Sequence, residues 1–151
     1  MDERLDQRSK MYMTMDSSLL GLAATIFVLI LTLKSELLTN ASITSQLVLS
    51  MPFFIASMLS HAKITDAETL TKYFVFNRVT TAVAFALLLN SLGLIIVHYV
   101  SNMIGVLFFA ILLIILATLE IMDFSNTRVT TEGIAFVIVV LLGLLPALGV
   151  F

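Results

Sequence analysis

The sequence predicts an all-α membrane protein, a polytopic transmembrane helical bundle with five spans. Three observations favour this class. Of the 151 residues, 60% are hydrophobic and only 12% are charged, against about 45–50% and about 25% in soluble domains. The charged residues fall into four clusters along the chain. The charge-free intervals that separate or follow these clusters are long enough to cross a bilayer.

Composition excludes several classes of function. The chain has no cysteine, which excludes a disulfide scaffold, a thiolate metal site and a cysteine nucleophile. Its 8 Lys plus Arg are outnumbered by 10 Asp plus Glu, so it lacks the basic surface of a nucleic-acid-binding protein. The opening segment mixes charges of both signs and has no cleavable apolar core. We therefore expect no signal peptide and a first span that directs its own insertion.

The boundaries of the spans follow from their length. A hydrocarbon core about 30 Å thick needs about 20 helical residues. The charge-free interval 79–119 is about twice that long, and Ser101 and Asn102 predict a hairpin at the water interface within it. A charged, cytoplasmic segment at 1–16 therefore precedes a single transmembrane domain at 17–151, with spans at about 17–36, 41–60, 79–100, 103–122 and 133–151.

The basic residues predict the orientation. The second span is the weakest, because serines dilute it and Pro52 interrupts it. If it crosses and the N-terminus is cytoplasmic, seven of the eight basic residues lie inside and only Lys34 lies outside, as the positive-inside rule expects. If it does not cross, three lie inside and five outside. We expect a cytoplasmic N-terminus, an external C-terminus and a location in the plasma membrane.

Two polar segments adjoin the spans. Residues 1–15 contain no glycine or proline, so they form either a charged helix that continues into the first span or a solvated, frayed terminus. The segment Thr65-Asp66-Ala67-Glu68 fits a capping box and predicts a cytoplasmic helical extension over about 66–78. The two histidines, His61 and His98, are assigned to opposite sides of the membrane. We therefore expect no haem, no metal site and no other cofactor.

A polar stripe runs along the second span, within an arc of about 100° at 3.6 residues per turn. Its members are Ser42, Gln46, Ser50, Ser57, Ser60 and His61. Polar groups without partners cost several kcal/mol in hydrocarbon, so this face must meet protein or water. One interpretation is the wall of a pore, with Phe53 or Phe54 at a constriction near Pro52. The other is that these side chains hydrogen-bond to neighbouring helices or to their own carbonyls.

Small and polar residues in the other spans predict helix packing. Ser17, Gly21 and Thr25 form a small-xxx-small stripe on the first span, which favours close packing against another helix. Asn90 is the most polar residue at bilayer depth in the third span. It either hydrogen-bonds to a neighbouring helix or contacts a substrate or ion. The fourth and fifth spans have few polar side chains, so we expect them to face lipid and the first three spans to build the interior.

Three acids lie close to the predicted cytoplasmic boundary: Asp16, Glu120 and Asp123. They are candidates for cation contacts at an inner mouth, and their alternative role is simply to reach the interface. We expect no ionisable residue at mid-depth in any span, which argues against a proton pump or a voltage sensor.

Together these features predict a non-catalytic protein. The loops are too short for a soluble catalytic unit, and no Ser-His-Asp set, carboxylate pair or phosphate-binding glycine loop can be assembled. The first hypothesis is a protein that acts by helix association, as a homo-oligomer or as an accessory subunit of a membrane complex, in contact with lipids and not with nucleic acid. The alternative is a small oligomeric ion channel or transporter whose path is lined by Gln46, Ser50, Phe53, Ser57 and Asn90.

Overall fold

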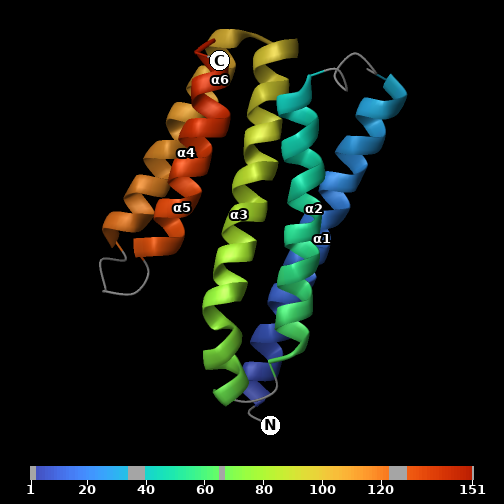
Figure 1. Ribbon diagram of the computed structural model, residues 1–151, viewed down its shortest axis with the longest axis vertical. Coiled ribbons are helices and arrows are strands. Elements are labelled where there is room, and N and C mark those ends of the chain that lie inside the picture. Colours follow the sequence, from blue (N-terminus) through green and yellow to red (C-terminus); the bar gives the residue numbers. More distant parts are fainter. Residues whose placement is uncertain (1–2, 34–39, 65–66, 123–128, 151) are drawn as a thin grey trace.

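The computed structural model describes residues 3–33, 40–64, 67–122 and 129–150, which form helices and short connections and contain no strand. This confirms the all-α class. Figure 1 shows the helices side by side in a bundle. In chain order they are α1 (Glu3–Leu33), α2 (Ala41–Ala62), α3 (Ala67–Tyr99), α4 (Asn102–Met122) and α5 (Val129–Val139), which continues through a π-helical turn (Val140–Leu144) into α6 (Leu145–Ala147).

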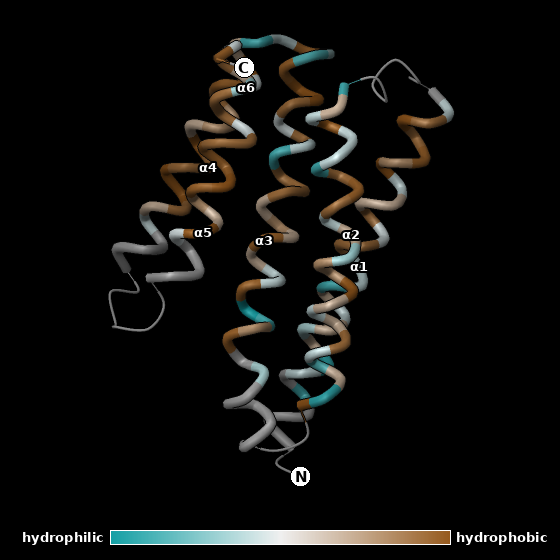
Figure 2. The backbone as a smooth tube through the Cα atoms, viewed as in Figure 1, coloured by the Kyte–Doolittle hydropathy of each residue, from teal (hydrophilic) through white to brown (hydrophobic). Residues whose placement is uncertain are grey.

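Three helices carry segments long and apolar enough to cross a membrane: Ser9–Thr32, Ala41–Ala62 and Val75–Tyr99. Shorter apolar helical segments follow at Asn102–Thr118 and Gly133–Ala147, and Figure 2 shows hydrophobic residues along most of α4 and α5. The structure thus contains three helices that are long and apolar enough to span a membrane, which suggests a membrane protein. The five crossings and the orientation of the termini stay predictions.

The first helix differs from its predicted boundary. The predicted span began at residue 17, directly after the last charged residue of the opening cluster. In the structure α1 is continuous from Glu3, the helical one of the two interpretations of the opening segment. Its apolar segment begins at Ser9. Asp16 therefore lies inside a candidate membrane span and not at its edge.

Helices α1 and α2 pack through residues spaced by heptads. The buried positions of α1 are seven residues apart: Ser9, Asp16, Ala23 and Ile30. Those of α2 include a series that alternates steps of four and three: Ile43, Leu47, Ser50, Phe54, Ser57 and His61. A spacing of 3.5 residues keeps one seam of each helix facing its partner. This seam places Asp16, Ser57 and His61 inside the bundle.

Helix α3 is the central element. It packs against α2 on one side and against α4 and α5 on the other (Figure 1). The fully buried ring of Phe109 on α4 lies where these helices meet. A Cβ atom added at Gly93 on α3 or at Gly143 in the π-helical turn would overlap this ring. Only glycine permits such close approach at these two positions.

The segment from α5 to α6, the predicted fifth span, bonds to the interior of the bundle, whereas we expected it to face lipid. Pro146 has no N–H, so the carbonyl of Leu142 lacks its usual donor four residues later. The side chain of Gln46 on α2 supplies the missing bond, with Nε2 2.7 Å from the Leu142 carbonyl oxygen. Asn90 on α3 donates from Nδ2 to the carbonyl of Ile138 at 3.0 Å. Backbone carbonyls of this last helical segment therefore anchor it to α2 and α3, a contribution invisible in its apolar side chains.

Candidate functional site

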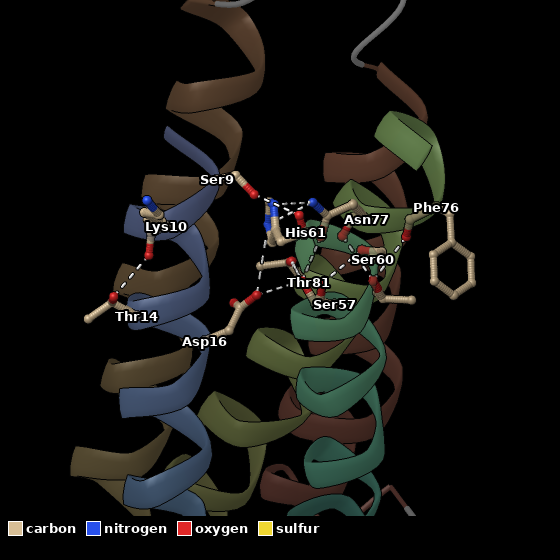
Figure 3. Close-up of polar contacts among 11 residues, drawn as sticks. Ser9, Lys10, Thr14, Asp16, Ser57, Ser60, His61, Phe76, Asn77 and Thr81 are labelled. Atoms are coloured by element: carbon tan, nitrogen blue, oxygen red, sulfur yellow. Dashed lines mark hydrogen bonds and ion pairs between the residues drawn. The ribbon is translucent and has the colours of Figure 1, made fainter. Parts of the chain in front are cut away.

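Five side chains from three helices form a buried group, here called the polar cluster: Asp16, Ser57, His61, Asn77 and Thr81 (Figure 3). Asp16 and Ser57 have no exposed surface, and His61 and Asn77 are each only 6% exposed. Thr81 is half-buried. Such a concentration of polar groups is rare in an apolar bundle, where each one must find a partner.

Helical spacing explains why these residues meet. Ser57 and His61 lie four residues apart on α2, and Asn77 and Thr81 lie four apart on α3. Residues at this spacing share one face of a helix. Asp16 reaches the same point from the buried heptad position of α1. Each of the three helices therefore contributes to the cluster with its inward face.

The hydroxyl of Ser57 is the centre of the cluster. Its Oγ lies 2.6 Å from Asp16 Oδ2, 2.6 Å from Asn77 Oδ1 and 2.6 Å from Thr81 Oγ1. Asn77 Nδ2 contacts the imidazole of His61, at 2.8 Å from Nδ1 and 2.6 Å from Nε2. Hydrogen bonds thus link the carboxyl of α1 to the imidazole of α2 through Ser57 and Asn77.

Asp16 and His61 also face each other directly. His61 Nε2 lies 3.9 Å from Asp16 Oδ2, a separation that allows a charge–charge interaction but is too long for a hydrogen bond. The second oxygen of the carboxyl, Oδ1, is buried and has no hydrogen-bond partner among the described residues. One acceptor of the cluster therefore remains vacant.

The opening turns of α1 cover the imidazole. The ring of Tyr12 stacks on His61 with a centroid separation of 5.2 Å and an interplanar angle of 9°. The hydroxyl of Ser9 donates to the His61 carbonyl at 2.7 Å. Beyond the end of α2, Lys63 is exposed and its Nζ lies 5.8 Å from the centre of the Tyr73 ring. His61 thus lies between the Asp16 carboxyl and the end of the bundle that carries Lys63 and Tyr73, here called the polar end.

The chemistry available to the polar cluster is acid–base chemistry. A carboxyl and an imidazole are the side chains that most readily change charge near neutral pH or below. In the described part of the chain, no group of three or more His, Asp or Glu side chains is placed to hold a metal ion. The cluster therefore has the groups to hold and release a positive charge.

The sequence-predicted path residues divide between two regions. Ser57 is in the polar cluster, whereas Gln46 and Asn90 lie further along the bundle and donate to backbone carbonyls. The hydroxyl of Ser50 donates to the Leu47 carbonyl of its own helix at 2.7 Å, and Phe53 is half-buried against the apolar core. In this single chain their donors engage protein, as in the packed interpretation. A role in lining a path stays a prediction.

The small-residue stripe on α1 does not mediate packing within the described chain. Ser17, Gly21 and Thr25 are exposed, and a Cβ added at Gly21 would meet nothing within 4 Å. Thr25 donates to the Gly21 carbonyl at 2.8 Å, so its hydroxyl is satisfied without a neighbour. Helix α1 packs on α2 through its heptad positions instead. As a face for a second chain, the stripe stays a prediction.

Of the other two candidate acids, Asp123 and the side chain of Glu120 lie outside the residues that the structure describes.

Three residues of the polar cluster were not among the predicted site residues: His61, Asn77 and Thr81. The available signal was the pairing of Ser57 with His61 and of Asn77 with Thr81 at four-residue spacing on neighbouring spans.

No protein-family model, curated protein or solved structure matches this chain.

The close packing at Gly143 gives a first test of the fold. A Cβ at this position would overlap Asn90 Oδ1 and the Phe109 ring, so Gly143→Ala must displace both. We expect it to lower the free energy of unfolding by about 1–3 kcal/mol, as overpacking does in well-packed interiors. Unfolding in mixed micelles by increasing sodium dodecyl sulfate measures the loss. The control is Gly133→Ala, where a Cβ meets nothing within 4 Å; equal stability of the two variants would contradict the prediction.

Proposed function

We propose that this chain is a multi-pass protein of the plasma membrane that moves a small cation and binds it at the polar cluster. The observation that carries the proposal is the complete burial of Asp16 within the candidate span Ser9–Thr32. An ionisable side chain inside a membrane segment is costly, and such residues commonly mark ion pathways and proton relays.

A purely structural role would not need a carboxyl. Ser57, Asn77 and Thr81 already hydrogen-bond α2 to α3 with neutral groups. Asp16 contacts Ser57 and faces the His61 ring at 3.9 Å, yet its Oδ1 has no partner in the described part of the chain. An unsatisfied buried polar group costs about 1–3 kcal/mol, or more when it is charged. The amide oxygens of Gln46 and Asn90 are also buried without a partner, but only the Asp16 oxygen belongs to a group that can carry a negative charge. This difference supports a role in which Asp16 binds a positive charge.

The helix lengths support five crossings. Helix α4 has 21 residues, about 31 Å at 1.5 Å per residue, which matches a hydrocarbon core of about 30 Å. The last segment, from α5 through α6, is continuous from Val129 to Ala147. With the N-terminus cytoplasmic, the polar cluster lies toward the cytoplasmic side of the membrane. This accords with the excess of basic residues predicted there.

Reconstitution of the full chain in phosphatidylcholine–phosphatidylglycerol vesicles tests the proposal. We expect a flux of protons, Na⁺ or K⁺ above that of protein-free vesicles when a gradient is applied. Asp16→Asn, which keeps the size of the side chain, is expected to lower this flux by about tenfold or more, since a contact to a charged group is worth about 1.5–3 kcal/mol and 1.4 kcal/mol is tenfold. The absence of flux for all three ions would contradict the proposal.

A second candidate function is assembly with another copy of the chain or with other membrane subunits through α1. It is favoured by the exposure of Ser17, Gly21 and Thr25 on one face of that helix, since small residues let helix backbones approach closely in lipid. This function is compatible with the first, because a conducting path through so small a bundle would be completed by several copies.

Gly21→Leu tests the second candidate. Because a Cβ at Gly21 meets nothing within 4 Å of the single chain, the variant should fold normally and lose only contacts between chains. We expect a lower oligomeric mass in detergent, measured by light scattering during size-exclusion chromatography. Gly133→Leu on α5 is the matched control, since its added Cβ also meets nothing within 4 Å. An unchanged mass for Gly21→Leu would exclude assembly through this face.

A further inference from the structure

We infer that the ion bound at the polar cluster is a proton held on the carboxyl of Asp16. When the proton leaves, the side-chain amide of Asn77 rotates by 180°. This inference rests on the proposed cation function and specifies its substrate. It follows from counting the hydrogen atoms available around Ser57. The count needs only the contacts of the cluster and the donor and acceptor capacity of each group.

The hydroxyl of Ser57 has more acceptors around it than it has protons. Within 2.6 Å of its Oγ lie Asp16 Oδ2, Asn77 Oδ1 and Thr81 Oγ1. A hydroxyl donates once and accepts twice, an amide oxygen only accepts, and an ionised carboxylate only accepts. Thr81 can donate to Ser57, but Asn77 Oδ1 and an ionised Asp16 would then compete for the single Ser57 proton. In this arrangement one close oxygen–oxygen contact has no hydrogen.

One added proton satisfies every contact of the Ser57 hydroxyl. When Asp16 Oδ2 is protonated, it donates to Ser57 Oγ, and Ser57 donates its own hydrogen to Asn77 Oδ1. Thr81 supplies the second bond that Ser57 accepts, and Asn77 Nδ2 donates to a ring nitrogen of His61. The hydroxyl then makes one donation and two acceptances, which is its full capacity. With the Asn77 amide in this orientation, the contacts of Ser57 correspond to the acid form of Asp16.

A half-turn of one amide satisfies the ionised form equally well. If the Asn77 amide rotates by 180° about its last bond, Nδ2 donates to Ser57 and Ser57 donates to the Asp16 carboxylate. The amide oxygen then faces His61 and accepts from its N–H, which a neutral or a protonated imidazole provides. The two states differ by one proton on Asp16 Oδ2 and by the orientation of one amide. On release the proton passes to water, and no other bond forms or breaks.

The same contacts do not suit a metal cation. Hard cations in proteins take about six or more oxygen ligands at once. The oxygens of Asn77 and Thr81 each already bond to Ser57 Oγ at 2.6 Å, and only Oδ1 of Asp16 is without a partner among the buried atoms of the cluster. One vacant oxygen is too few for Na⁺ or K⁺, whereas a proton requires a single acceptor.

His61 gives the proton a route toward the polar end of the bundle. Its ring lies 3.9 Å from Asp16 Oδ2, stacks on Tyr12 and precedes the exposed Lys63 at the end of α2. Among the side chains that the structure describes, the other charged or titratable ones near this end include Lys10 on α1 and Tyr73 and Arg78 on α3. Imidazole is the group best suited to exchange protons near neutral pH. It can therefore accept the proton once the ring comes within hydrogen-bond distance of Asp16, and then pass it to water.

Parallel flux measurements on the full chain test the inference. Vesicles of phosphatidylcholine and phosphatidylglycerol hold an entrapped pH dye for proton flux, and matched samples measure uptake of radioactive Na⁺ and Rb⁺ under the same membrane potential. We expect proton flux above protein-free vesicles and Na⁺ and Rb⁺ uptake equal to them. Asp16→Asn should abolish the proton flux, and Ser57→Ala should lower it about tenfold, since it removes a hydrogen bond to an ionisable group.

A buried serine outside the cluster provides the control. Ser91 on α3 has no exposed surface and donates only to the Leu88 carbonyl of its own helix at 2.8 Å, so Ser91→Ala should conduct as the wild type. Each variant must elute from a size-exclusion column at the same volume as the wild type and show the same helical circular dichroism. Flux of Na⁺ or Rb⁺ that needs Asp16, without proton flux, would overturn the inference but leave the proposed function. Proton flux unchanged in Asp16→Asn or in Ser57→Ala would overturn the inference, and no flux of any ion would overturn both.

Discussion

Phe109→Ala is expected to lower the free energy of unfolding by about 3–5 kcal/mol, the range for deleting a buried aromatic side chain. The ring has no exposed surface, and it fills the space that Gly93 and Gly143 leave open by having no side chain. Neither glycine can fill the cavity, because neither has atoms to move into it. The loss should therefore lie near the upper end of the range.

Unfolding of the variant in mixed micelles by sodium dodecyl sulfate measures this loss. Phe108→Ala is the matched control, because Phe108 neighbours Phe109 on α4 but is only half-buried. We expect the control to lose clearly less stability. Equal losses for the two variants would show that the ring of Phe109 does not join α3, α4 and α5 as described.

Ser57→Ala is expected to lower the free energy of unfolding by about 2–3 kcal/mol, since it leaves buried polar groups of Asp16 and Asn77 without their shared partner. The loss should depend on the carboxyl. In a chain that already carries Asp16→Ala, the hydroxyl of Ser57 has one fewer buried partner. Ser57→Ala should therefore lower the free energy of unfolding by less in that chain than in the wild type. The two substitutions should therefore be coupled, by about 0.5–3 kcal/mol as for residues in one hydrogen-bond network.

A double-mutant cycle measures this coupling. It compares the wild type, the two single variants and the double variant in the same micelles. A matched cycle of Asp16→Ala with Ser91→Ala should give additive losses, because Ser91 bonds only within α3. Additive losses for Asp16 and Ser57 as well would mean that the 2.6 Å contact between them does not hold α1 to α2.

The sequence predicted the helical class and located the helices because both depend on local properties. Charges and apolar runs mark where each helix lies, and Ser101 and Asn102 mark the α3–α4 turn, where the structure ends one helix at Tyr99 and begins the next at Asn102. Two features escaped it. The π-helical turn and the carbonyl of Leu142 that Pro146 leaves free are backbone features, and their partners, such as Gln46, lie far away in the chain.

The site was predicted only in part, for a physical reason. The polar stripe of the second span singled out Ser57, and Asp16 was identified as a candidate for a cation contact. Placing the span boundary after the last charge put Asp16 outside the membrane, and the expectation of no ionisable residue at depth followed from that choice. In the structure Asp16 shares the buried seven-residue spacing of Ser9, Ala23 and Ile30, but two of these four residues are polar, so no apolar seam marks this face in the sequence. Which helix face meets which is a tertiary property that spacing within one helix does not determine.

Infrared difference spectroscopy of the reconstituted chain tests the central claim, proton exchange at Asp16, most directly. Spectra at high and low pH should differ by the C=O stretch of a protonated carboxylic acid in an apolar environment. This band should be absent in Asp16→Asn, shifted in Ser57→Ala because its hydrogen-bond partner is gone, and unchanged in Ser91→Ala. The other carboxyls of the chain also protonate at low pH, so the diagnostic signal is the component at the frequency of an apolar site. Persistence of that component in Asp16→Asn, or its absence at every pH in the wild type, would contradict the account.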